Sequence, residues 1–204
     1  MKDTTMSTST MTTTQPTLIA ALWPARKRLG VYRQGALAVA GSLLLILSAK
    51  ISIPFWPVPM TMQTFAVLVI GMAYGPRLGL ATVLLYLAEG AFGMPVFAGT
   101  PEKGIGLAYM MGPTGGYLVG FAVSAFLVGL LAERGWDRSI PLTLTAMVLG
   151  TAVIFLLGVG YLSTLIGFEK AVQFGLMPFL PGAALKIALA AAVLPMAWKV
   201  FYKP

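Results

Sequence analysis

The stretch Leu180-Pro-Gly-Ala-Ala-Leu-Lys186-Ile-Ala-Leu-Ala-Ala-Ala-Val-Leu-Pro-Met-Ala-Trp198 decides the fold class of this chain. Its length suits a helix that crosses a bilayer, because about 20 apolar residues span the hydrocarbon core. It contains one charged residue, Lys186, in its second turn. A charge inside a membrane span is costly and faces a protein interior or a watery cavity. The stretch therefore predicts a membrane helix that contributes to a polar site.

The overall composition is that of an integral membrane protein. Of the 204 residues, 58% are hydrophobic and 10% are charged, whereas soluble domains carry about 25% charged residues. The chain has neither cysteine nor histidine, which excludes disulfides, the usual zinc ligand sets and histidine-activated nucleophiles. No GxxxxGK[ST] phosphate loop occurs. We therefore predict that the protein is not an enzyme and has no catalytic residues and no metal site.

Apolar stretches separated by proline-rich, glycine-rich or polar segments predict an all-α membrane protein with six transmembrane helices. The predicted spans are residues 34–52, 60–73, 78–90, 114–132, 140–166 and 180–198. Residues 1–32 are predicted to be a disordered or interfacial cytoplasmic segment, because a Thr/Ser/Met-rich tail precedes a basic stretch. The apolar run Leu18–Trp23 is too short for a signal-peptide core, so no cleavage is expected. Residues 33–200 form the predicted membrane domain.

The basic residues indicate how the spans are oriented. Six spans place both termini on one side, which receives ten of the fourteen lysines and arginines. The other side receives four lysines and no arginine: Lys50, Lys103, Lys170 and Lys186. The positive-inside rule therefore predicts that both termini are cytoplasmic. It also explains the net charge of +8 by topology and affinity for anionic lipid, so no nucleic-acid partner is expected.

This topology gathers several features on the outer side. The proline-rich loop at residues 54–59, the end of the third span with Glu89, and Lys186 all fall there. So does the long apolar connection Ala91–Met111, and long apolar loops often fold back as lids. The convergence predicts a pocket that captures a small solute from outside under a mobile lid.

The candidate substrate-binding residues combine polar groups with aromatic walls. They are Gln63, Tyr86, Glu89, Lys186, Phe97, Tyr117 and Trp56. Gln63 can donate and accept hydrogen bonds at once, which suits an amide-like or urea-like ligand. Five of them have a structural alternative. Gln63 could form an interhelical hydrogen bond, Glu89 could be a solvated helix end, Trp56 could be an interfacial anchor, and the two tyrosines could have a buried structural role.

Small residues recur every fourth position in two of the predicted spans. Ala36 and Ala40 form one such pair in the first span, and Gly112, Gly116 and Gly120 form a series at the start of the fourth. Small residues at this spacing let helices approach closely. The alanine pair predicts either an intramolecular seam or a docking face for a partner. The glycine series predicts tight packing or a flexible helix start.

Four segments in order resemble the BioY family, the biotin-binding S components of energy-coupling factor (ECF) transporters. They are Pro57-Val-Pro-Met-Thr-Met-Gln-Thr64, Gly93-Met-Pro-Val-Phe-Ala98, Gly112-Pro-Thr-Gly-Gly-Tyr-Leu118, and Phe179-Leu-Pro-Gly182 with Lys186. The resemblance covers about residues 33–200 and implies a six-helix S-component fold in a bacterial inner membrane. It implies biotin as transported ligand, with no cofactor. It also implies a transmembrane coupling protein and two ATPase subunits as partners, with Ala36 and Ala40 as the docking motif.

Some alternatives stay open beside this resemblance. They are an S component for another vitamin and an autonomous secondary carrier. An enzyme acting on lipid would need clustered carboxylates or a nucleophile with a base, and the sequence shows neither.

One position departs from the resemblance. BioY proteins typically carry an aspartate directly after the Pro-Gly of the last helix, where this chain has Ala183. Lys186 is retained. An unpaired ammonium in an apolar pocket is costly, so we predict that Glu89 supplies the missing acceptor and counter-charge.

Overall fold

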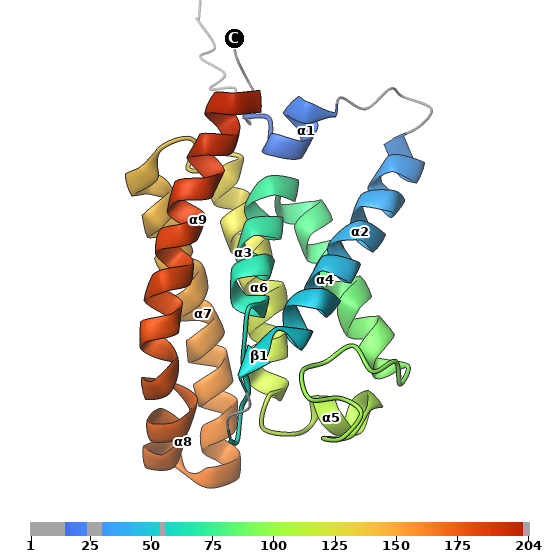
Figure 1. The fold of residues 1–204 in the computed structure, drawn as a ribbon, viewed down its shortest axis with the longest axis vertical. Coiled ribbons are helices and arrows are strands. Elements are labelled where there is room, and N and C mark those ends of the chain that lie inside the picture. Colours follow the sequence, from blue (N-terminus) through green and yellow to red (C-terminus); the bar gives the residue numbers. More distant parts are fainter. Residues whose placement is uncertain (1–14, 24–29, 54–55, 202–204) are drawn as a thin grey trace, which may run out of the picture.

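Six main helices form a bundle in a computed structural model that describes residues 15–23, 30–53 and 56–201 (Figure 1). They are α2 (Gly30–Lys50), α3 (Gln63–Tyr74), α4 (Pro76–Ala91), α6 (Gly115–Ala132), α7 (Ile140–Ile166) and α9 (Leu180–Phe201). Each overlaps one of the six predicted spans, although residues 60–61 of the predicted second span form a strand. The all-α membrane fold predicted from the sequence is therefore confirmed.

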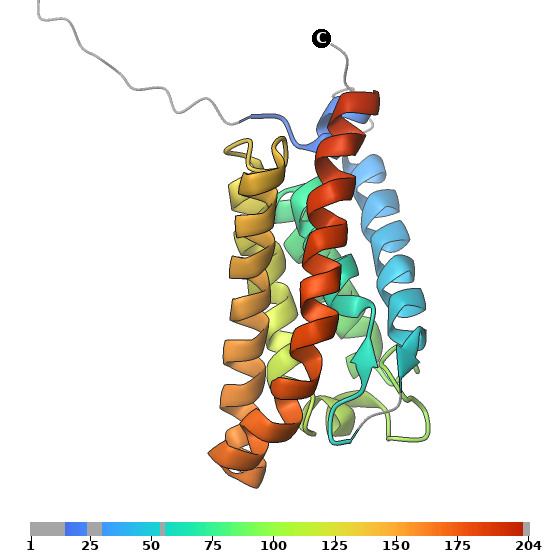
Figure 2. The same cartoon turned by 60° about the vertical axis from the view of Figure 1, so that its left-hand side comes forward.

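Shorter elements connect the long helices. They are α1 (Leu18–Leu22), the antiparallel strands β1 (Ser52–Ile53) and β2 (Met60–Thr61), α5 (Gly106–Met110), α8 (Phe168–Gly175) and the 3-10 turn η1 (Met177–Phe179). Figures 1 and 2 show α1 and the last turns of α9 at one end of the bundle, called here the terminal end. The β-strands, α5 and α8 lie at the opposite end, called here the loop end. The basic stretch 26–28 lies outside the described residues.

The helices differ in how much of a bilayer they could cross. By length and composition, α2, α6, α7 and the stretch Phe168–Val200 that contains α9 could span a membrane. In contrast, α3 has 12 residues and α4 has 16, or about 18 and 24 Å of helix at 1.5 Å per residue. The hydrocarbon core is about 30 Å thick. Because α3 begins only at Gln63, the strand β2 and not a helix leads into it from the loop end.

Helix α6 lies at the centre of the bundle and packs against α3, α4 and α7. Glycines permit the closest of these contacts. A Cβ on Gly116 would lie 2.4 Å from the Leu157 carbonyl oxygen, and one on Gly120 would lie 2.9 Å from Ile154 Cα. The part of the predicted glycine series that lies in α6 therefore serves tight packing against α7.

The turn between α6 and α7 holds the end of α9 at the terminal end. Trp198 Nε1 donates a hydrogen bond of 2.6 Å to the Asp137 carboxylate, and the Arg138 guanidinium lies 4.6 Å from the centre of the Trp198 ring. Asp137 is fully buried. Burial raises the pKa of Asp137, although the bond from Trp198 opposes that shift. These contacts keep the last turns of α9 against the bundle.

Basic residues lie at both ends as the predicted topology requires. Those described at the terminal end are Arg33, Arg77, Arg134, Arg138 and Lys199, and those at the loop end are Lys50, Lys103, Lys170 and Lys186. Every described arginine thus lies at the terminal end, together with α1 and the last turns of α9. Arg33 belongs to the first turn of α2, because that helix begins four residues earlier than the predicted span.

Candidate functional site

A cavity opens at the loop end between β2, α3, α6, α7 and α9. Its empty volume is about 730 Å³, counting the open space at its mouth. Apolar side chains form most of the wall, including Leu68, Phe97, Leu118, Phe121, Phe155 and Phe179. The polar side chains on the wall are Thr61, Gln63, Thr64, Tyr109, Thr114, Tyr117, Thr151 and Lys186. A few polar groups in an apolar wall are typical of a site that orients one small molecule.

Lys186 reaches this cavity from the second turn of α9. Its ammonium donates hydrogen bonds to the Thr61 backbone oxygen and, over 3.1 Å, to Thr64 Oγ1. These acceptors belong to β2 and to the first turn of α3. An ammonium has three N–H donors, so one donor is left over after these two bonds. The lysine can therefore bind a ligand oxygen while its charge stays solvated by the protein.

Gln63 is the first residue of α3, and its orientation follows from the tyrosine behind it. Tyr86 has a single hydroxyl proton, which it donates to the Val96 carbonyl oxygen over 3.2 Å. Its oxygen must then accept from Gln63, so the amide NH2 group faces Tyr86, at 2.7 Å. The side-chain oxygen of Gln63 is consequently the group left to accept a hydrogen bond from a ligand.

Tyr86 itself does not line the cavity. It is fully buried on α4, where it orients the Gln63 amide and holds the segment around Val96. The sequence placed Tyr86 among the pocket residues, whereas the structure places it one layer behind the wall. The hydroxyl is thus a positioning group.

Phe97 covers one side of the cavity and is packed on three sides. Its ring stacks on Tyr109 with centroids 4.9 Å apart and meets Tyr86 edge-on at 5.4 Å. Gly90 on α4 provides the space for this ring, because a Cβ there would lie 2.0 Å from Phe97 Cζ. The predicted lid loop therefore inserts an aromatic side chain into a slot that only glycine leaves open.

Hydrogen bonds from two further residues pin the same loop. Lys50, the last residue of α2, donates to the Phe97 and Thr100 carbonyl oxygens at 3.1 Å each and to Thr100 Oγ1 at 3.2 Å. The Tyr109 hydroxyl donates to the Ala98 oxygen at 2.8 Å. Sequence reasoning missed both residues. A lone lysine at the end of an apolar span was the available signal for Lys50, but only the folded loop supplies its acceptors.

Tyr117 contributes a wall of the cavity from α6. Its hydroxyl donates to the Gly175 carbonyl oxygen at 2.7 Å and so ties α6 to the end of α8. A Cβ on Gly158 would lie 2.3 Å from the Tyr117 ring, so this glycine makes room for it on α7. Because its proton is already used, Tyr117 offers a ligand mainly its ring face.

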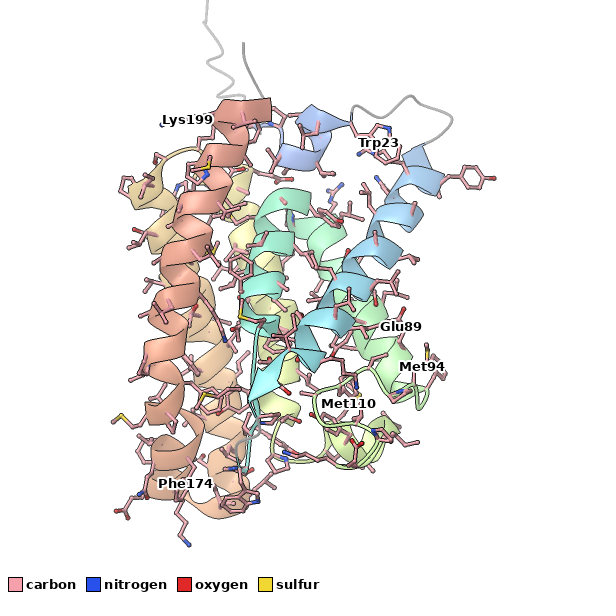
Figure 3. All side chains as sticks on the ribbon, viewed as in Figure 1. Trp23, Glu89, Met94, Met110, Phe174 and Lys199 are labelled. Atoms are coloured by element: carbon pink, nitrogen blue, oxygen red, sulfur yellow. The ribbon has the colours of Figure 1, made fainter. Side chains whose placement is uncertain are left out.

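Trp56 and Glu89 lie away from the cavity. Trp56 is 69% exposed, and its ring centre lies 6.1 Å from that of Phe174 on α8. Glu89 lies on α4 (Figure 3), where its carboxylate accepts a hydrogen bond from Ser42 of α2. Because α4 turns Glu89 toward α2 while Lys186 donates to Thr61 and Thr64, the predicted pairing of Glu89 with Lys186 is not formed.

Ala183 is part of the cavity wall, one turn before Lys186 on α9. The position at which this sequence departs from the BioY pattern therefore faces the cavity. The side chains that line the cavity, all of them in the described part of the chain, include no carboxylate. Hydroxyl and amide oxygens are the acceptors that this cavity offers.

Ala36 and Ala40 lie on the outer face of α2 and are exposed. The exposed leucines Leu43, Leu44 and Leu47 continue this face along the helix. The pair therefore forms no seam within the described bundle, and its role as a docking motif stays a prediction.

The comparison with known families shows the family of this chain. Residues 11–203 match the model of the BioY family. The chain belongs to the BioY family. Among its BioY relatives are the biotin transporter BioY of Rhizobium etli, 39% identical over 82% of this chain and 91% of the relative, and that of Thermotoga maritima, 40% identical over 74% and 86%.

A solved structure confirms the S-component fold of this BioY-family chain. The crystal structure of the S component for biotin from an ECF-type ABC transporter superposes with a TM-score of 0.73. The match covers 88% of this chain and 100% of that protein, at 23% sequence identity. The relatives are described as transporters, in agreement with the prediction that the chain is not an enzyme.

Proposed function

We propose that this protein binds biotin in the loop-end cavity and is the substrate-capturing subunit of an ECF-type transporter. The observation that carries the proposal is the combination of the Lys186 ammonium and the Gln63 amide oxygen within one aromatic cavity of a BioY-family chain. Biotin needs hydrogen-bond partners for its ureido ring, apolar contacts for its bicycle and a cation or donors for its carboxylate. The cavity supplies each of these. Lys186 can serve either the carboxylate or the ureido oxygen.

Calorimetric titration of biotin into the purified, detergent-solubilised protein tests this function. We expect one-to-one binding with a Kd below about 1 μM, which corresponds to about −8 kcal/mol. Thiamine and riboflavin, titrated in parallel, should not bind. Binding of either vitamin in preference to biotin would assign the cavity to another substrate. Biotinamide, which lacks the carboxylate charge, shows which end of biotin Lys186 holds.

The loop end is proposed to face outward, with loop 91–111 as a lid over the cavity and both termini in the cytoplasm. Phe97 and Ala98 line the cavity, and the bonds from Lys50 and Tyr109 hold this part of the loop. The distribution of arginines supports the orientation in an inner membrane. Protease added to intact spheroplasts is expected to cleave within loop 91–111, and biotin is expected to slow that cleavage. Cleavage only after lysis would mean that the loop end faces the cytoplasm. Equal cleavage rates with and without biotin would mean that loop 91–111 is not a lid.

The outer face of α2 is the proposed contact for the transmembrane coupling protein, which would act with two ATPase subunits. Ala36 and Ala40 are exposed there, and small residues let a partner helix come close. The double substitution of Ala36 and Ala40 by leucine is expected to abolish co-purification with the coupling protein while biotin binding persists. Replacing Leu47 by alanine, on the same face, is the matched control. Retention of the partner by the double variant would exclude this face.

A further inference from the structure

A second cavity lies at the terminal end of the bundle, between α1, the first turns of α2 and the turn from α3 to α4. Its empty volume is about 1,180 Å³, counting open space at its mouth. Its described lining residues differ from those of the loop-end cavity. Arg33, Arg77 and the acid Glu133 are among them. The biotin-capturing function gives this cavity no role.

Arg33 lacks a hydrogen-bond partner for part of its guanidinium among the residues that the structure describes. Its Nε and Nη1 atoms are shielded from solvent and form no hydrogen bond. Buried charged donors without an acceptor are unfavourable. A guanidinium presents its N–H groups as a planar fork that matches phosphate or carboxylate oxygens. The unmet donors of Arg33 therefore point to an anionic ligand.

The charge around the cavity fits a single negative group. Glu133 does not satisfy the arginines, since neither forms an ion pair with it among the residues that the structure describes. The charged side chains among the described lining residues, Arg33, Arg77 and Glu133, sum to one positive charge. An anion at Arg33 would neutralise that charge.

The remaining wall and its surroundings suit a lipid. Ile19, Val31 and Leu78 are among the apolar residues that line the cavity. Beside it, Trp23 at the end of α1 is 55% exposed and Tyr32 on α2 is 78% exposed, as expected for aromatic residues at a membrane interface. A soluble anion would gain nothing from these apolar surfaces, whereas the glycerol and upper acyl chain of a phospholipid would cover them.

We propose that the terminal-end cavity binds the phosphate group of an anionic phospholipid, with Arg33 as the principal donor and Arg77 as the second cation. Basic pockets between membrane helices on the cytoplasmic side are suited to such headgroups. A lipid bound here would join α1 to the first turn of α2 and to the α3–α4 turn. It would thus fasten the N-terminal part of the described chain to the bundle.

The site is tested by adding four probes to the delipidated full-length protein in detergent. The probes are phosphatidylglycerol, phosphatidylcholine, inorganic phosphate and glycerol 3-phosphate. Native mass spectrometry measures lipid affinity, and thermal melts measure stabilisation. We expect wild type to bind phosphatidylglycerol in preference to phosphatidylcholine, and Arg33→Gln to weaken this binding at least fivefold. The matched control is Arg134→Gln, an exposed arginine at the same end that does not line the cavity. It should behave as wild type.

Biotin affinity verifies that each variant is folded, because the described lining residues of the two cavities differ. If Arg33→Gln does not fold, Arg33→Lys replaces it and should bind phosphatidylglycerol more weakly than wild type, since lysine keeps the charge but lacks the planar fork. Equal losses in Arg33→Gln and Arg134→Gln would overturn the site in favour of general surface attraction. Stabilisation by inorganic phosphate or glycerol 3-phosphate, with none by phosphatidylglycerol, would assign it to a soluble anion and overturn the lipid. If Arg33→Gln binds phosphatidylglycerol like wild type but no longer co-purifies with the coupling protein, the cavity contacts a protein partner and the lipid proposal is overturned.

Discussion

Replacing Lys186 by alanine is expected to weaken biotin binding by roughly 10- to 100-fold. A hydrogen bond to a charged group contributes about 1.5–3 kcal/mol, and each 1.4 kcal/mol is a factor of ten in Kd. The substitution removes the ligand's cationic partner and also leaves the Thr61 oxygen and Thr64 hydroxyl without their donor. Calorimetry on the purified variant measures the loss.

Lys170→Ala is the control for this prediction, because Lys170 is an exposed lysine of α8 at the same end and does not line the cavity. It should bind biotin like wild type. A variant that keeps the length of the side chain, Lys186→Met, separates charge from packing and should lose nearly as much affinity as alanine. Wild-type affinity in both Lys186 variants would mean that biotin is bound elsewhere or without a cation.

Replacing Gly90 by alanine is expected to lower both stability and biotin affinity, although the new side chain does not contact biotin. The added Cβ would overlap the Phe97 ring, and that ring is held between Tyr86 and Tyr109. Overpacking of this kind costs about 1–3 kcal/mol. Because Phe97 must move and it lines the cavity, we expect biotin affinity to fall about tenfold. Thermal melts and calorimetry on the same preparation measure the two effects.

Gly160→Ala is the matched control, because Gly160 is a helical glycine of α7 whose Cβ would meet nothing within 4 Å. In open space, alanine favours a helix over glycine by about 1 kcal/mol, so this variant should be as stable as wild type or more so. A smaller residue at position 97, as in the double variant Gly90→Ala with Phe97→Leu, should recover part of the lost stability. If Gly90→Ala matched Gly160→Ala in both measurements, the close fit of Phe97 against Gly90 would contribute neither to stability nor to biotin affinity.

The sequence named seven candidate substrate-binding residues, and the structure brings four of them together. Gln63, Phe97, Tyr117 and Lys186 all line the loop-end cavity. Each lies in one of the segments that resemble the BioY family. The hydropathy pattern had already assigned these segments to the same side of the membrane.

The remaining candidates show that the sequence pattern did not predict which way a side chain faces. Glu89 and Lys186 belong to the same end of the bundle, yet α4 is rotated so that Glu89 meets Ser42. Trp56 follows the strand β1 into an exposed position beside α8. Knowing the side of the membrane therefore does not reveal which way a side chain faces.

The sequence by itself determined the membrane class, the six helices, their alternating direction and the end at which a charged pocket would form. These properties depend on hydropathy along the chain and on the placement of basic residues, both of which act through the bilayer and need no tertiary contact. Tertiary structure alone decided the rotation of each helix and the hydrogen bonds from Lys50 to the lid. It also decided that Tyr86 lies behind the cavity wall, where it orients Gln63. Rotation depends on which side chains interlock across helices, as Phe97 does with Gly90, and those contacts join residues that no local pattern relates.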